Sequence, residues 1–136
     1  MPDSPNRMSP LMIGTLSVPT RFLLAPLAGI SDLPYRLLNR RFGCGFAFFE
    51  MLSARSLVFQ GRRIRKMISA CAEDRPVGVQ LLAKDPDDAL RALDLLDMAH
   101  IDLIDLNAAC PVPKIVAKGQ GAALPREPKR LSLILN

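Results

Sequence analysis

Residues 76–106 read PVGVQLLAKDPDDALRALDLLDMAHIDLIDL, and this stretch decides the fold class. Its apolar run from Pro76 to Leu82 predicts a buried strand. Asp85 is a candidate helix N-cap followed by a proline, and the helix that it begins is expected to end near His100. Ile101 to Leu106 predicts a second buried strand. Strand, helix and strand in this order are typical of a βαβ unit, whose two strands are parallel.

The same alternation continues toward the N-terminus. Phe46 to Phe49 predicts another buried strand, and a basic helix is expected to follow it from about Ala54 to Ile68. Before that strand, Ser31 and Asp32 are candidate N-caps and Gly43 is a candidate helix stop. Apolar strands separated by helices indicate a parallel sheet rather than a sandwich.

Both ends of the chain extend this pattern. Two apolar runs, 11–16 and 20–25, are separated by Ser17-Val18-Pro19 and predict a small hairpin that leads into a buried strand. At the other end, a Pro- and Gly-rich loop leads into a final segment, 128–136. We therefore predict a single α/β domain, 1–136, with about four βα units preceded by a hairpin.

The composition excludes several classes of protein. At 136 residues the chain is too short for two well-buried domains, and with 49% apolar residues it is not a disordered chain. No apolar run approaches the roughly 18 to 20 residues of a membrane helix. Three cysteines without a CxxC pair or a nearby histidine predict neither a disulfide framework nor a zinc site. We expect a cytoplasmic protein that binds neither a metal nor a membrane.

Charge is distributed unevenly along the chain. Residues 36–66 contain eight basic residues and one acidic residue, whereas residues 67–105 contain nine acidic and three basic residues. From residue 106 onward there are five basic residues and one acidic residue. Basic segments on both sides of an acidic one are compatible with binding to a polyanion, and also with ordinary solvated helix faces.

Polar and reactive residues gather where the predicted strands end. The segment from Ala25 to Gly29 follows the first strand, Glu50 follows the second, and Gln80 lies in the third. The fourth strand runs into Asn107 and Cys110. Because the functional sites of parallel α/β folds lie beyond the carboxyl ends of the strands, we expect these residues to share one rim.

Each of these residues also has a purely structural explanation. Glu50 can cap the following segment, and Gln80 needs only a backbone hydrogen-bond partner. Asn107 can close an Asx-turn, and Cys110 can be a small buried apolar group. Taken together, these residues fit a more specific chemistry. A carboxamide can hydrogen-bond a planar heterocycle, and a thiol on a loop can donate a proton or act as a nucleophile.

Other site patterns are missing or weak in this sequence. No strand is followed by GxGxxG, and there is no GxxxxGK[ST] phosphate loop. Gly119-Gln120-Gly121 is an isolated GxG in a loop. His100, the one histidine, lies at the start of the fourth strand and away from Cys110, and we interpret it as a structural residue such as a helix C-cap.

Five segments occur in a characteristic order: LAPLAGISD (24–32), FEMLSA (49–54), VQL (79–81), IDLNAACPVPK (104–114) and KGQGAAL (118–124). Together they resemble the tRNA-dihydrouridine synthases, flavin-dependent enzymes that reduce specific uridines in tRNA. The resemblance extends over about residues 11–130, and the Asn-x-x-Cys-Pro loop with its Pro-Lys extension is fairly specific.

This resemblance implies a TIM (β/α)8 barrel that binds FMN, with NADPH as the reductant and tRNA as the substrate. Such a barrel takes about 200 residues or more, so the chain corresponds to an N-terminal partial barrel. The C-terminal half barrel and the helical tRNA-binding domain would lie beyond Asn136. Because a half barrel leaves strand edges open, we expect residues 1–136 alone to bind FMN weakly and to be poor catalysts.

The resemblance also assigns the residues that hold the cofactor. Pro26, Leu27 and Ala28 would line the flavin ring, and Gln80 would hydrogen-bond its polar edge. Leu27 stands where the family usually has Met, which is a tolerable exchange of apolar side chains.

The catalytic and substrate-binding residues follow from the same resemblance. The flavin would give a hydride to C6 of the uracil, and Cys110 would be the general acid that protonates C5. Asn107 would help to hold the flipped-out base, and Lys114 would bind the substrate as well. Ala109 replaces a Gly that is common in the family, and this exchange is strained if the position needs a positive φ.

Two other functions fit the same residues. One is a non-catalytic RNA-binding remnant of the fold, in which the basic residues between Arg55 and Lys66 would meet phosphates. The other is a different FMN-barrel oxidoreductase that acts on a small molecule, and the loop at 107–114 weighs against it.

Overall fold

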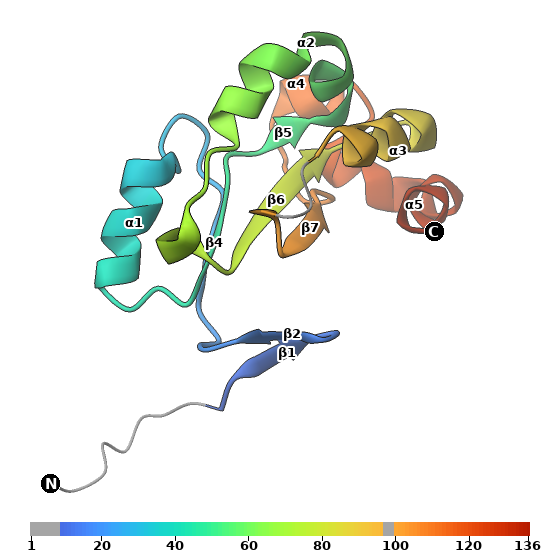
Figure 1. Ribbon diagram of the computed structural model, residues 1–136. Helices are drawn as coiled ribbons and strands as arrows, with labels where there is room; N and C mark the ends of the chain where they lie inside the picture. Colours follow the sequence, from blue (N-terminus) through green and yellow to red (C-terminus); the bar gives the residue numbers. More distant parts are fainter. Residues whose placement is uncertain (1–8, 97–99) are drawn as a thin grey trace, which may run out of the picture.

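The computed structural model describes residues 9–96 and 100–136, without the side chains of residues 60–63 and 65–67. Its main element is a parallel sheet with helices packed against it (Figure 1). The strands are β3 (Leu23–Leu24), β4 (Phe46–Phe48), β5 (Leu52–Ser53), β6 (Val77–Leu82) and β7 (Leu103–Leu106). The predicted α/β class with parallel strands is confirmed, and the described strands form an open sheet.

Helices alternate with these strands as the sequence predicts. They are α1 (Leu33–Arg41), α2 (Ala54–Met67), α3 (Pro86–Leu95), α4 (Pro113–Val116) and α5 (Pro128–Leu135), with short 3-10 turns η1 (Ala72–Asp74) and η3 (Gly121–Arg126). Asp32 and Asp85 are confirmed as N-caps, since Asp32 accepts a hydrogen bond from the Tyr35 N–H and Asp85 accepts one from the Asp87 N–H, each at 2.9 Å. Ser31, the other candidate for the first cap, instead bonds to Leu27 through its Oγ.

One predicted helix end is wrong. The helix expected to continue to about His100 ends at Leu95, because the backbone at Leu96 turns extended with φ −80° and ψ 133°. Residues 97–99 lie outside the described part of the chain.

The predicted N-terminal hairpin is present, but its turn is not where the sequence pattern placed it. Strands β1 (Leu11–Ile13) and β2 (Leu16–Val18) pair antiparallel around Gly14-Thr15, so residues 17 and 18 belong to a strand rather than to the turn. Gly14 has φ +58°, a left-handed conformation that a two-residue hairpin turn requires and that glycine adopts at little cost. In Figure 1 the hairpin lies below the sheet, away from the arrowhead of β6.

Strands β4 and β5 pair with the same neighbour, β6, and are two parts of one strand separated by a bulge. Phe48 lies opposite Gly78 and Leu52 opposite Leu81. Four steps along β4–β5 therefore match three steps along β6, and one residue is extra. A bulge bends its strand and redirects the side chains next to it, here those of residues 49–51.

The core lies around β6, which is buried along most of its length between the neighbouring strands and the helices. Helices α2 and α3 pack against each other above this strand (Figure 1). The core side chains include Phe49, Leu57, Val79, Leu81, Ala92 and Leu96. A strand apolar on both faces is typical of a parallel sheet covered by helices.

A buried ion cluster joins α1 to η1. The Arg36 guanidinium donates from Nε and Nη2 to Asp74 Oδ2, at 2.9 and 2.8 Å, and both side chains are 0% exposed. Arg40 donates to the carbonyls of Asp74 and Pro76, at 2.7 and 2.6 Å. The interpretation of this basic segment as a solvated helix face is therefore wrong for Arg36, because its guanidinium is buried and paired with Asp74.

Candidate active site

The loop after β7 is held by the side chain of Asn107. Its Oδ1 accepts hydrogen bonds from the N–H groups of Ala109 and Cys110, at 3.1 and 2.8 Å. The bond to the residue two positions later is the predicted Asx-turn. The Asn107 N–H donates to Leu81 O at 2.8 Å, so the loop begins in register with β6. The half-buried Cys110 is thus fixed at the carboxyl end of the sheet.

The other side of the Asn107 amide connects this loop to β6. Asn107 Nδ2 donates to Gln80 Oε1 at 2.8 Å and to Met51 Sδ at 3.1 Å. Gln80 Nε2 in turn donates to Asp105 Oδ2 at 2.6 Å. Gln80 and Asp105 are direct partners in the parallel β6–β7 pair, which explains why their side chains meet. The Gln80 carboxamide is therefore hydrogen-bonded to two side chains, those of Asn107 and Asp105, rather than to a backbone group as expected.

The segment Ala25–Gly29 is tied to the same rim from the other edge of the sheet. Glu50, in the bulge, accepts a hydrogen bond from the Gly29 N–H at 2.6 Å. Ser31, 0% exposed, binds both the N–H and the carbonyl of Leu27 through Oγ, at 2.9 and 3.0 Å. Glu50 therefore holds this loop and does not cap the segment that follows it. The N–H of Ser56, in the first turn of α2, donates to Ser53 Oγ instead.

These contacts place most of the predicted site residues in one arrangement. Cys110 is linked through Asn107 to Gln80 and to Met51, and the neighbour of Met51, Glu50, holds the loop that contains Pro26, Leu27 and Ala28. Lys114 is not part of it: it lies exposed on α4 and forms no hydrogen bond or ion pair with another described residue.

The arrangement leaves room and polar capacity for a flat heterocycle. Leu27 is 38% exposed, and a Cβ built on Gly29 would meet no atom within 4 Å, so the surface above this loop is open. The Gln80 carboxamide has two N–H groups and two oxygen lone pairs, and the contacts above use one of each. The loop thus offers exposed apolar surface, and the carboxamide on the same rim has one N–H and one lone pair unused.

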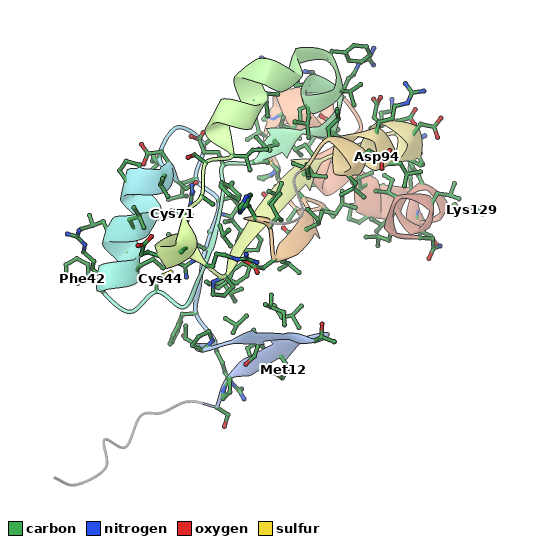
Figure 2. All side chains as sticks on the ribbon, viewed as in Figure 1. Met12, Phe42, Cys44, Cys71, Asp94 and Lys129 are labelled. Carbon is green, nitrogen blue, oxygen red and sulfur yellow. The ribbon has the colours of Figure 1, made fainter. Side chains whose placement is uncertain are left out.

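The other two cysteines lie elsewhere. Figure 2 shows Cys44 and Cys71 on the side of the molecule that carries α1, and all three thiols are free. The hydrogen bond with Glu73, together with desolvation, raises the pKa of the Cys71 thiol, so this thiol stays protonated at neutral pH. Within residues 9–96 and 100–136, no three potential ligand side chains are grouped as for a metal ion. In the same residues, no helix has the length and apolarity needed to cross a bilayer.

Comparison with known proteins identifies the family of this chain. The family model for dihydrouridine synthase matches residues 23–136, which include every residue of the network just described. The chain belongs to the dihydrouridine synthase family.

Three relatives illustrate the similarity. The tRNA-dihydrouridine synthase B of Pseudomonas aeruginosa is 34% identical over 129 residues, which are 95% of this chain and 39% of that protein. A probable tRNA-dihydrouridine synthase of Treponema pallidum is 34% identical over 90% of this chain and 36% of its own length. One of Rhizobium leguminosarum is 35% identical over 83% of this chain and 35% of its own length. The chain thus spans less than two fifths of the length of these dihydrouridine synthases.

The departure from the dihydrouridine synthase pattern at Ala109 causes no backbone strain. Every residue with a positive φ in the described part of the chain is a glycine, so Ala109 is in an ordinary conformation. Its N–H still contributes to the turn closed by Asn107.

Sequence reasoning missed the roles of Asp105 and Met51 in the network, and that of Gly121, which packs against Cys110. An acid inside the apolar strand at 103–106 was a usable signal for Asp105. The isolated GxG motif was a weak signal for Gly121. No local signal pointed to Met51, because its role depends on the bulge that brings it to Asn107.

Gly121 holds the thiol loop by close approach of the backbone. It has φ +58°, and a Cβ at this position would lie 2.6 Å from Cys110 O and 3.0 Å from Cys110 Cβ. The next N–H, of Ala122, donates to the same Cys110 carbonyl at 3.0 Å.

We expect Gly121→Ala to displace the Cys110 loop and to destabilise the protein by about 1–3 kcal/mol, since a strained φ and a steric clash coincide. Urea denaturation measures this change. Ala122→Gly, which keeps the hydrogen bond, is the control and should lose much less stability. Wild-type stability in Gly121→Ala would show that the close approach is unimportant.

Proposed function

We propose that the protein reduces uridine in tRNA to 5,6-dihydrouridine with FMN and NADPH, and that this chain forms the N-terminal part of its flavin-binding TIM barrel. The observation that carries the proposal is the Asn107 side chain, which joins the Cys110 loop to Gln80 and Met51. A thiol, a carboxamide and an open apolar loop are thereby fixed at one rim, as the reaction needs.

The residues of the chain have separate tasks in this proposal. Pro26, Leu27 and Ala28 form the apolar surface for the flavin ring, and Gln80 offers its unused N–H and lone pair to the polar edge of the ring. The chemistry that FMN supplies when bound is hydride transfer, here to C6 of the uracil. Cys110 donates the proton that C5 receives, which completes the addition of two hydrogens across the C5=C6 bond.

Asn107 and Lys114 are the proposed substrate-binding residues. The four hydrogen-bonding positions of the Asn107 amide are all occupied by protein partners. A direct contact between Asn107 and the base therefore requires the exchange of one of these bonds, and Asn107 also serves the substrate by holding the Cys110 loop. Lys114, exposed on α4 close to that loop in the sequence, is free to meet an RNA phosphate.

Nucleoside analysis of tRNA tests this function. With tRNA as its substrate, we expect the protein to work in the cytoplasm. Deletion of the gene, in cells without other dihydrouridine synthases, should remove dihydrouridine from at least one tRNA position, and the wild-type gene should restore it. Unchanged dihydrouridine after deletion would exclude the proposed function.

A further inference from the structure

A cavity of about 550 Å³ opens beside the proposed active site. Its lining comes from the start of α2, from the segment that joins β6 to α3, and from the loop that follows α4. The first two segments directly follow the carboxyl ends of β5 and β6, and the third belongs to the connection that begins at the end of β7, so the cavity lies on the same rim of the sheet as Cys110. Three cations contribute to this lining: Arg55, Lys84 and Lys118.

These cations have no protein counterion. The ammonium groups of Lys84 and Lys118 form no hydrogen bond or ion pair with any residue that the structure describes, and the Arg55 guanidinium lies over the Phe59 ring, 5.8 Å from its centre. The stem of Lys84 rests against Gly119, where a Cβ would lie 3.3 Å from its Cδ and Cε. Lys84 therefore packs beside the residue that follows Lys118, and an anion between these positive charges would be stabilised.

Two acids also line the cavity, and both belong to the start of α3. Asp85 caps this helix by accepting the Asp87 N–H at 2.9 Å, and Asp88 lies in its first turn. Carboxylates in these positions are stabilised by the positive end of the helix dipole. The cations of the lining outnumber these carboxylates by three to two.

The cavity is part of the same structural unit as the proposed catalytic thiol. Gln120 lines the cavity, and two residues later the Ala122 N–H donates to Cys110 O at 3.0 Å. A nucleotide whose base is presented to Cys110 must carry its own phosphates close by, and these phosphates are monoanions that Lys and Arg recognise.

We propose that this cavity binds a backbone phosphate of the RNA next to the nucleotide that is reduced, with Lys84 and Lys118 as its main ligands and Arg55 as a third. The inference rests on the proposed function and adds a phosphate subsite to it. A flavin phosphate would have the same chemistry, but none of the lining residues comes from the loop after β3, which forms the proposed flavin surface. We therefore assign the cavity to RNA.

The test compares Lys84→Gln, Lys118→Gln and their double variant with wild type in the purified protein. Affinity for an unmodified tRNA transcript is measured over a range of salt concentrations, and affinity for FMN is measured by flavin fluorescence. Each substitution should reduce the slope of log affinity against log salt by about one and leave FMN binding unchanged. Arg41→Gln is the matched control, because this exposed residue lies at the far end of α1, next to Phe42, which is labelled in Figure 2.

Each other result overturns the phosphate subsite. An unchanged slope in the double variant excludes it, even in a protein that makes dihydrouridine. Reduced FMN affinity with an unchanged slope would assign the cavity to the flavin phosphate instead, and absence of tRNA binding by the wild type would also exclude it. A reduced slope in a protein that forms no dihydrouridine would keep the subsite while the proposed reaction fails, so the two failures can be distinguished.

Discussion

In the proposed reaction, Cys110→Ala is expected to reduce dihydrouridine formation by about 10²- to 10⁴-fold, the usual contribution of a positioned general acid. The Asn107 side chain binds the backbone N–H of residue 110 rather than the thiol, so alanine leaves the loop and its hydrogen bonds in place. Affinity for tRNA should therefore change little. Nucleoside analysis of tRNA and a filter-binding assay measure the two quantities on the same preparation.

Cys44→Ala and Cys71→Ala are the controls for this prediction. Both thiols are half-buried like Cys110, but they lie beside α1 and away from the rim (Figure 2). Either substitution should retain most of the activity. Equal losses in all three variants would mean that the effect is one of stability, and normal activity in Cys110→Ala would remove Cys110 from the mechanism.

Asp74→Ala is expected to lower the free energy of unfolding by about 3–5 kcal/mol, because it leaves a buried arginine without its carboxylate. Arg36 is 0% exposed and lies 4.3 Å above the centre of the Phe49 ring, so water cannot replace the lost partner. Arg36 Nη1 also donates to Ser31 O at 2.6 Å. Since Ser31 holds Leu27, the loss should loosen the proposed flavin loop as well.

Urea denaturation measures this change in stability. Asp94→Ala is the matched control, because Asp94 is an exposed aspartate on α3 (Figure 2) and its loss should stay within about 0.5 kcal/mol of wild type. Asp74→Asn should fall between the two, since it keeps an acceptor for Arg36 but not the charge. A loss below 1 kcal/mol in Asp74→Ala would mean that the buried ion pair contributes little.

The buried pair also changes how the charge pattern of the chain is understood. Counting charges along residues 36–66 suggests a strongly basic surface, yet Arg36 is enclosed and Arg40 donates to backbone carbonyls. The cations available to an anion are those without partners, such as Lys84 and Lys118. Charge counts in a sequence therefore overestimate the positive surface here.

Much of the fold was predictable because its signals are local. Asp32 and Asp85 act within one helical turn, and the apolar runs at 46–49 and 76–82 have the length and composition of buried strands. The parallel arrangement follows from the alternation of strands and helices. Because parallel strands end on the same side of a sheet, the chain also predicted that Gln80, Asn107 and Cys110 would share a rim.

The details of the site depend on packing between distant segments. Glu50 reaches Gly29 and Met51 reaches Asn107 because a bulge adds one residue opposite β6. No local sequence pattern predicts this extra residue. The pairing of Asp74 with Arg36, 38 residues away in the chain, likewise requires α1 and η1 to be packed together. Secondary structure is set by interactions over a few residues, whereas register and burial are properties of the whole folded chain.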